Sequence, residues 1–72
     1  MRRIPLYNRT AQPLQIGLEP EGDCFSLGAG QECELRYGQT APDDLEIEFE
    51  ADLVSIHCSE PKEIWQGGKR VK

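Results

Sequence analysis

Apolar and polar residues alternate along several short segments of this chain, and turn-forming residues separate the segments. The clearest segment is 45–50, which reads Leu-Glu-Ile-Glu-Phe-Glu. Successive side chains of a β-strand point to opposite faces, so a period of two is typical of a strand with one buried face and one wet face. No window shows an apolar pattern at helical spacing that is long enough to predict a helix. The sequence therefore predicts an all-β protein.

The alternation predicts six or seven short strands, which we expect at 3–7, 14–19, 24–27, 32–37, 45–50, 53–58 and 63–66. Turns rich in Gly, Pro, Asn and Asp recur at intervals of about ten residues, which favours a small antiparallel β-sandwich or open barrel. Short connections favour hairpins between sequence neighbours, and parallel pairing would need longer crossovers. In the segment 45–50 we expect Leu45, Ile47 and Phe49 to face the core and their glutamate neighbours to face water.

The chain is long enough for one domain. Its 72 residues can enclose a single core, and we expect one β-sandwich domain over 1–72 with a disordered basic tail at 67–72. All 13 acidic residues lie between positions 19 and 63, where Arg36 and Lys62 are the only basic residues. Such an acidic body repels phosphate backbones, which argues against nucleic acid as its partner. No apolar run is long enough for a membrane span or a secretory signal, so we expect a cytoplasmic protein.

Four side chains have the chemistry to bind zinc: Cys24, Cys33, His57 and Cys58. Their spacing contains no C-x2-C or H-x3-H pair, and adjacent strand residues such as His57 and Cys58 point to opposite faces. We therefore expect Cys33 and Cys58 to pack in the core as small apolar residues, and Cys24 to be the most exposed thiol. We expect no cofactor, and a thiol or metal site built from these four residues is the alternative function.

No constellation of residues predicts an enzyme. Ser55 and His57 share a strand face and could form a hydrogen bond, but no nucleophile elbow or oxyanion loop accompanies them. A chain of this length also has little room for a pocket that excludes water. A very small hydrolase that uses Ser55 or Cys58 with His57 is a third hypothesis.

Four residues are candidates for binding a partner protein: Glu46, Glu48, Glu50 and Trp65. Alternate carboxylates on one strand lie about 7 Å apart in a row, which differs from the converging cage that Ca²⁺ needs. The row is either a solvated face that discourages edge-to-edge pairing or a site for a basic partner. Trp65 either plugs one end of the core or anchors a partner, because tryptophan is enriched at interface hot spots. The sequence thus favours a non-catalytic interaction or structural domain, with a protein partner or a homodimer as its assembly.

Three stretches resemble a group of small uncharacterised bacterial proteins: residues 8–10, 13–22 and 27–32. The shared pattern is an N-x-T turn, an apolar strand that ends in L-E-P-x-G, and a second strand that ends near a glycine before an acidic residue. The acidic alternating strand at 45–49 is also similar. The resemblance implies a small β-sandwich, similar to immunoglobulin-like or cupredoxin-like folds, and it supplies no activity. A cupredoxin copper site needs two histidines with a cysteine, whereas this chain has one histidine.

Overall fold

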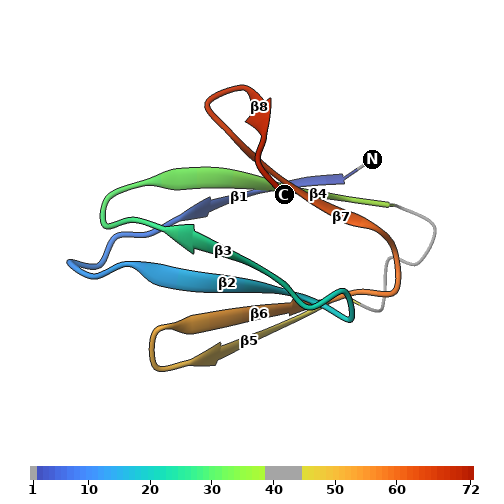
Figure 1. Cartoon of the computed structure of the whole chain (residues 1–72), viewed down its shortest axis with the longest axis horizontal. Coiled ribbons are helices and arrows are strands. Elements are labelled where there is room, and N and C mark those ends of the chain that lie inside the picture. The colour runs from blue at the N-terminus through green and yellow to red at the C-terminus, as the bar shows by residue number, and fades with distance from the viewer. Residues whose placement is uncertain (1, 39–44) are drawn as a thin grey trace.

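The computed structural model describes residues 2–38 and 45–72, and every regular element among them is a β-strand. Sheet A has the order β1-β4-β7-β8, and its strands are β1 (Arg2–Tyr7), β4 (Glu32–Tyr37), β7 (Lys62–Gln66) and β8 (Lys69–Arg70). Sheet B has the order β3-β2-β6-β5, and its strands are β3 (Asp23–Leu27), β2 (Leu14–Glu19), β6 (Leu53–His57) and β5 (Glu46–Glu50). The two sheets pack on each other (Figure 1), which confirms the predicted small all-β sandwich.

One strand pair departs from the expected antiparallel pattern. β2 and β6 run parallel, whereas the other pairs among the described residues are antiparallel. The sequence predicted hairpins between strands that are neighbours in the sequence, and the structure forms three of them: β2–β3, β5–β6 and β7–β8. Between β2 and β6 the chain passes through β4 of sheet A and returns through β5, so the parallel pair needs no direct crossover.

The segment that we expected to be a disordered tail contains a paired strand. Gly67 and Gly68 have φ values of 61° and 79°, which is the conformation that a type I′ hairpin turn requires at both central positions. The turn folds Lys69 and Arg70 back beside the end of β7. The Gly-Gly pair is therefore the signal for a hairpin at the place where we expected a disordered tail to begin.

The core lies between the two sheets and is built from alternate residues of their strands. Its fully buried apolar side chains are Ile16, Leu18, Leu27, Leu35, Ile56 and Ile64. Cys33, Tyr37 and Cys58 belong to the same buried cluster, so the expected core positions of the two cysteines are confirmed. Burying one large aliphatic side chain stabilises the fold by roughly 1.5–3 kcal/mol, so this set supplies much of the apolar driving force for folding.

A buried asparagine links two loops at one end of the sandwich. Asn8 directly follows β1 and is 1% exposed. Its Nδ2 donates to the carbonyl oxygens of Gln12 at 2.8 Å, Leu27 at 3.0 Å and Gly28 at 3.0 Å. Its Oδ1 accepts from the backbone N–H of Thr10 at 3.0 Å and from the Thr10 hydroxyl at 2.7 Å. The N-x-T turn is therefore a buried polar connection between the β1–β2 loop and the β3–β4 loop.

A buried lysine links two other loops. The Lys62 side chain is 0% exposed, and its Nζ pairs with Glu21 Oε1 at 2.8 Å. The same Nζ donates to the carbonyl oxygens of Cys58 at 2.6 Å and Glu60 at 3.0 Å. Burial alone raises the pKa of Glu21, but the hydrogen bond and charge of Lys62 outweigh it, and the pKa lies below its usual value of 4.5. This ion pair holds the β2–β3 turn against the loop before β7.

The predicted burial of β5 is wrong for two of its apolar residues. Ile47 lies opposite Ile56 and Phe49 lies opposite Val54, so both point to the inner side of sheet B as predicted. They are nevertheless 37% and 79% exposed, and all residues of β5 are exposed. Among the described strands β5 lies at an edge of sheet B, so no described strand covers these inward side chains from the side. Leu45, just before β5, is partly buried and packs against the core as expected.

Candidate interaction surface

The three glutamates of β5 form an acidic row on the outer face of sheet B. Glu46 lies opposite His57 and Glu48 lies opposite Ser55 in the β5–β6 register. His57 Nε2 lies 2.8 Å from Glu48 Oε1, and the two side chains are 39% and 64% exposed. The predicted outward direction of the glutamates is therefore confirmed, and the row remains accessible to water.

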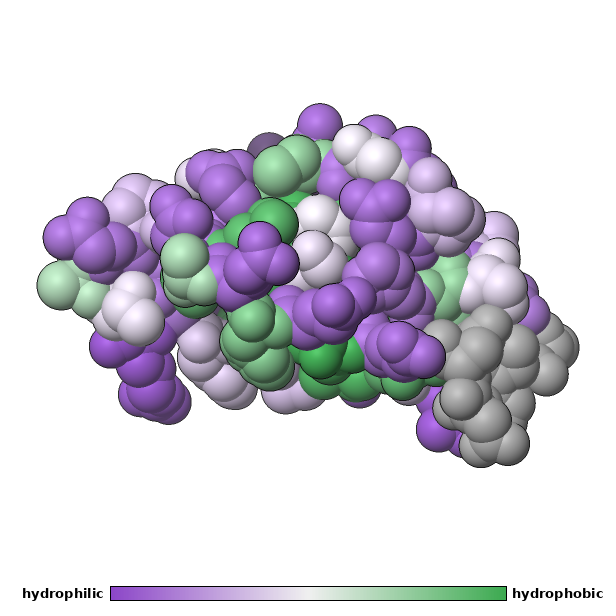
Figure 2. All heavy atoms as spheres, turned by 90° about the horizontal axis from the view of Figure 1, so that it is seen from below, coloured by the Kyte–Doolittle hydropathy of each residue, from purple (hydrophilic) through white to green (hydrophobic). Residues whose placement is uncertain are grey.

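Exposed apolar surface accompanies the acidic row. Phe49 is 79% exposed and lies between Glu48 and Glu50 in the sequence. Figure 2 views the molecule from the side on which β5 lies, and it shows hydrophobic surface in the middle of this view with hydrophilic groups around it. We call Glu46–Glu50, with both of its faces and its open backbone side, the β5 edge. It combines acidic and apolar groups within one strand.

Two backbone hydrogen bonds between β6 and β2 determine which way β6 directs its N–H and C=O groups. Gln15 N donates to Asp52 O at 2.8 Å, and Cys58 N donates to Glu19 O at 3.2 Å. Both bonds join the ends of β6 to β2, and both involve even-numbered residues on the β6 side. Because backbone groups alternate in direction along a strand, the odd-numbered residues of β6 direct their N–H and C=O groups to β5.

The same alternation shows which backbone groups of β5 face outward. The odd-numbered residues of β6 lie opposite the three glutamates of β5, so the glutamates form the hydrogen bonds to β6. Ile47 and Phe49 lie between them, and their N–H and C=O groups therefore point away from β6. The β5 edge thus offers a short row of backbone donors and acceptors beside exposed apolar side chains.

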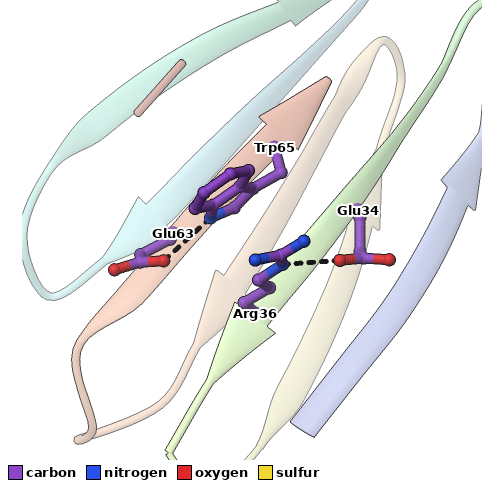
Figure 3. A network of polar contacts seen from close by, with 4 residues as sticks. All are labelled: Glu34, Arg36, Glu63 and Trp65. Carbon is purple, nitrogen blue, oxygen red and sulfur yellow. Dashed lines mark hydrogen bonds and ion pairs between the residues drawn. The ribbon is translucent and has the colours of Figure 1, made fainter. Parts of the chain in front are cut away.

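Trp65 lies on the other sheet and does not join the β5 edge. It occupies β7, where its register partner is Glu34 of β4. The Arg36 guanidinium carbon lies 3.9 Å from the Trp65 ring centroid, while Arg36 Nε donates to Glu34 Oε1 at 2.6 Å. Trp65 Nε1 donates to Glu63 Oε1 at 2.8 Å, as Figure 3 shows. Sequence reasoning paired Trp65 with the acidic row, but the fold places them on different sheets.

The Trp65 network borders an open groove of about 350 Å³ on sheet A, lined by Pro5, Tyr7, Glu32, Cys33, Glu34, Arg36, Trp65 and residues 66–68. Two of its charged side chains contact each other, because Arg36 pairs with Glu34. Outside the lining residues, Arg70 Nη1 lies 3.4 Å from Glu63 Oε2. One face of the indole is occupied by Arg36. The Arg36–Trp65 contact lies on the outer face of sheet A. The sequence did not predict it, because it depends on the pairing of β4 with β7.

The Cys and His candidates occupy separate environments. Cys33 and Cys58 are buried in the core, Cys24 is exposed on β3, and His57 lies on the outer face of sheet B. Burial raises the pKa of the Cys33 thiol to about 11, so it stays protonated. Across residues 2–38 and 45–72, no three His, Cys, Asp or Glu side chains gather in a way that could hold a metal ion.

The structure separates the two residues of the thiol form of the third hypothesis, Cys58 and His57. Cys58 is 3% exposed and belongs to the core cluster, whereas His57 is paired with Glu48 on the opposite face of the sheet. Ser55 lies opposite Glu48 in the β5–β6 register. A Cys58 thiol activated by His57 is therefore not formed in this geometry, because the two side chains point to opposite faces.

Sequence reasoning found the acidic row but missed the exposure of Phe49. The signal for an apolar face at 45–50 was correct, but alternation carries no information on whether a strand lies in the centre of a sheet or at its edge.

Comparisons with protein-family models, with curated proteins and with solved structures found no match to this chain. Among the residues that the structure describes, no helix is long and apolar enough to cross a membrane.

Proposed function

We propose that this chain is a non-catalytic protein-interaction domain whose binding surface is the β5 edge. The observation that carries the proposal is the exposure of an apolar side chain within an acidic edge strand: Phe49 is 79% exposed, and the glutamates on either side of it are exposed as well. Protein interfaces commonly have an apolar centre surrounded by polar groups. The β5 edge has this composition within a few residues.

The β5 edge is already held in a fixed conformation before a partner binds, which also favours binding. β5 is paired with β6 along its whole length, and β6 carries Ile56, which is 0% exposed. A surface that is ordered before binding loses less conformational entropy when a partner docks. Exposed aromatic side chains contribute strongly to binding because they bury a large area with few rotatable bonds.

The charge of the surface favours a basic partner. Glu46, Glu48 and Glu50 project from one face of the strand, and like-charged groups in a row attract a surface of opposite sign and repel acidic proteins. Glu48 also contacts β6, where His57 Nε2 lies 2.8 Å from Glu48 Oε1. We place this function in the cytoplasm, because none of Cys24, Cys33 and Cys58 is in a disulfide and reduced thiols are typical of a reducing compartment.

Site-specific photocrosslinking tests the proposal. A benzophenone amino acid replaces Phe49 in the intact protein, and the cells that produce the protein are irradiated. We expect a discrete crosslinked protein that is basic, because residue 49 lies between Glu48 and Glu50 on an acidic edge strand. The crosslink should be lost when Glu48→Lys and Glu50→Lys are added, because these changes reverse the charge beside the probe.

The matched control carries the same benzophenone residue at Tyr7, which is 53% exposed on β1 of sheet A. It presents an exposed aromatic group to the same cell contents from a different surface. If both positions give the same crosslinked proteins, or if position 49 gives none, the β5 edge is not a specific binding surface and the proposed function is wrong.

A further inference from the structure

We propose that the partner of the β5 edge is an extended basic segment that adds to sheet B as a new strand beside β5. The inference rests on the proposed function, because it names the chemistry and binding mode of the partner at the same surface. In the described part of the chain, β5 is the last strand of sheet B. An open strand edge is a template for a strand of another chain, whose backbone supplies affinity while its side chains supply specificity.

The direction of the backbone groups determines how such a strand would align. The outward N–H and C=O groups of β5 belong to Ile47 and Phe49. An added antiparallel strand would exchange hydrogen bonds with these two residues, and the partner side chains opposite them would share their face. The partner residue between these two would lie opposite Glu48, in a non-hydrogen-bonded pair, where the two side chains come closest.

The side chains of β5 then specify the partner sequence. Ile47 and Phe49 are 37% and 79% exposed on the inner side of the sheet, so apolar partner residues would cover them. Glu46, Glu48 and Glu50 lie on the other face, so lysine or arginine would lie opposite each of them. The matching segment therefore alternates basic and apolar residues, beginning and ending with a basic one, and it is extended.

A second copy of β5 does not match this edge. Only backbone groups that face outward can bond to each other, so Ile47 and Phe49 of one copy would have to lie opposite the same residues of the other copy. Every such register also places glutamates of the two copies opposite one another. Like charges that are directly opposite destabilise a strand pair, which leaves a basic segment as the occupant that this edge favours.

Binding of defined peptides to the isotope-labelled full chain tests this inference by NMR titration. The probe is the peptide acetyl-Lys-Val-Lys-Val-Lys-amide, and its control is acetyl-Lys-Lys-Val-Val-Lys-amide, which has the same composition without the alternation. We expect the alternating peptide to bind at least about fivefold more tightly, because only it can direct its lysines to the acidic face and its valines to the apolar face. The amide signals of Glu46–Glu50 should shift most.

Methylation of single peptide nitrogens tests the hydrogen bonds themselves. In the added strand, the two valine N–H groups point to β5 and the central lysine N–H points away. We expect N-methylation of both valines to abolish binding, while N-methylation of the central lysine leaves the affinity within about twofold. Equal effects of the two modifications, or equal affinity of the scrambled peptide, would overturn strand addition, because either result indicates attraction by charge alone.

Protein variants test the predicted partner chemistry. Glu48→Lys should weaken binding of the lysine peptide by about tenfold, and it should create binding of acetyl-Lys-Val-Glu-Val-Lys-amide, whose glutamate lies opposite the changed residue while its lysines still face Glu46 and Glu50. Asp23→Lys makes the same charge change on β3, the opposite edge of sheet B, and should weaken lysine-peptide binding less than Glu48→Lys does. An equal loss of peptide affinity in both variants would overturn the inference. It would also be overturned if the protein dimerised without peptide and if Glu48→Lys abolished that dimer. Crosslinking at Phe49 with no alternation-dependent peptide binding would leave the proposed function standing and refute only strand addition.

Discussion

Replacing Asn8 with alanine should remove a large part of the stability of this domain. The Asn8 side chain donates to three loop carbonyls and accepts two bonds from Thr10 within a site that is 1% exposed. A typical hydrogen bond contributes about 1 kcal/mol net, and a buried polar group that loses its partner costs about 1–3 kcal/mol. Because the bond to Leu27 O is buried, we expect a total loss of roughly 3–5 kcal/mol.

This loss is large compared with the expected stability of the chain. At about 0.05–0.15 kcal/mol per residue, a domain of this size is stable by roughly 4–11 kcal/mol. Urea unfolding followed by the fluorescence of Trp65 measures the difference, which should appear as a lower midpoint at an unchanged slope. Thr10→Val is the control: Thr10 is exposed, so losing its hydroxyl should cost about 1 kcal/mol or less. A loss in Asn8→Ala no larger than that in Thr10→Val would refute the role of Asn8 as a buried link.

Three further predictions follow from other contacts of the structure. Glu21→Gln should lower the urea midpoint at neutral pH. The pKa of Glu21 in the folded protein lies below its usual value of 4.5, so the stability that its carboxylate adds is complete above 4.5 and is lost as the pH falls through the folded pKa. The difference between the variant and the wild type should therefore vanish below the folded pKa. In the native protein Cys24 should react with a thiol reagent, while Cys33, with its pKa of about 11, should react only after urea unfolding. An absorbance assay of the thiolate that the reagent releases measures both reactions in the folded and the unfolded protein. Rapid reaction of Cys33 in the folded protein would contradict its burial. Ile56→Val, at a site that is 0% exposed, should cost about 0.5–1.5 kcal/mol by urea unfolding, and a stability equal to the wild type would mean that this position is not tightly packed.

Much of the fold could be predicted from local patterns. The alternation in 32–37 placed Cys33, Leu35 and Tyr37 on one face, and the structure buries all three. The same logic assigned Cys58 to the core and separated it from its neighbour His57. The glycines at 67 and 68 also contained a hairpin signal, which we did not use when we expected a disordered tail. These features depend on residues that are close in the sequence.

The candidate site could be predicted only in part. The glutamates at 46, 48 and 50 project outward as the period of two predicts, yet the same period also predicted burial of Phe49, which is 79% exposed. The packing of Arg36 on Trp65 and the burial of Lys62 likewise depend on partners that lie many residues away. A local pattern contains no information on such partners.

The amino-acid sequence by itself determined most of the strands and the face that their side chains occupy, because both depend on the backbone geometry of a few consecutive residues. Only the tertiary structure decided which strands are central and which form edges, that β2 pairs in parallel with β6, and that Trp65 lies on a different sheet from the acidic row. These properties depend on how distant segments share one core, since a buried strand needs neighbours on both sides and a covering sheet. Among the described residues, β5 has a strand neighbour on one side only, β6, so its other side is accessible.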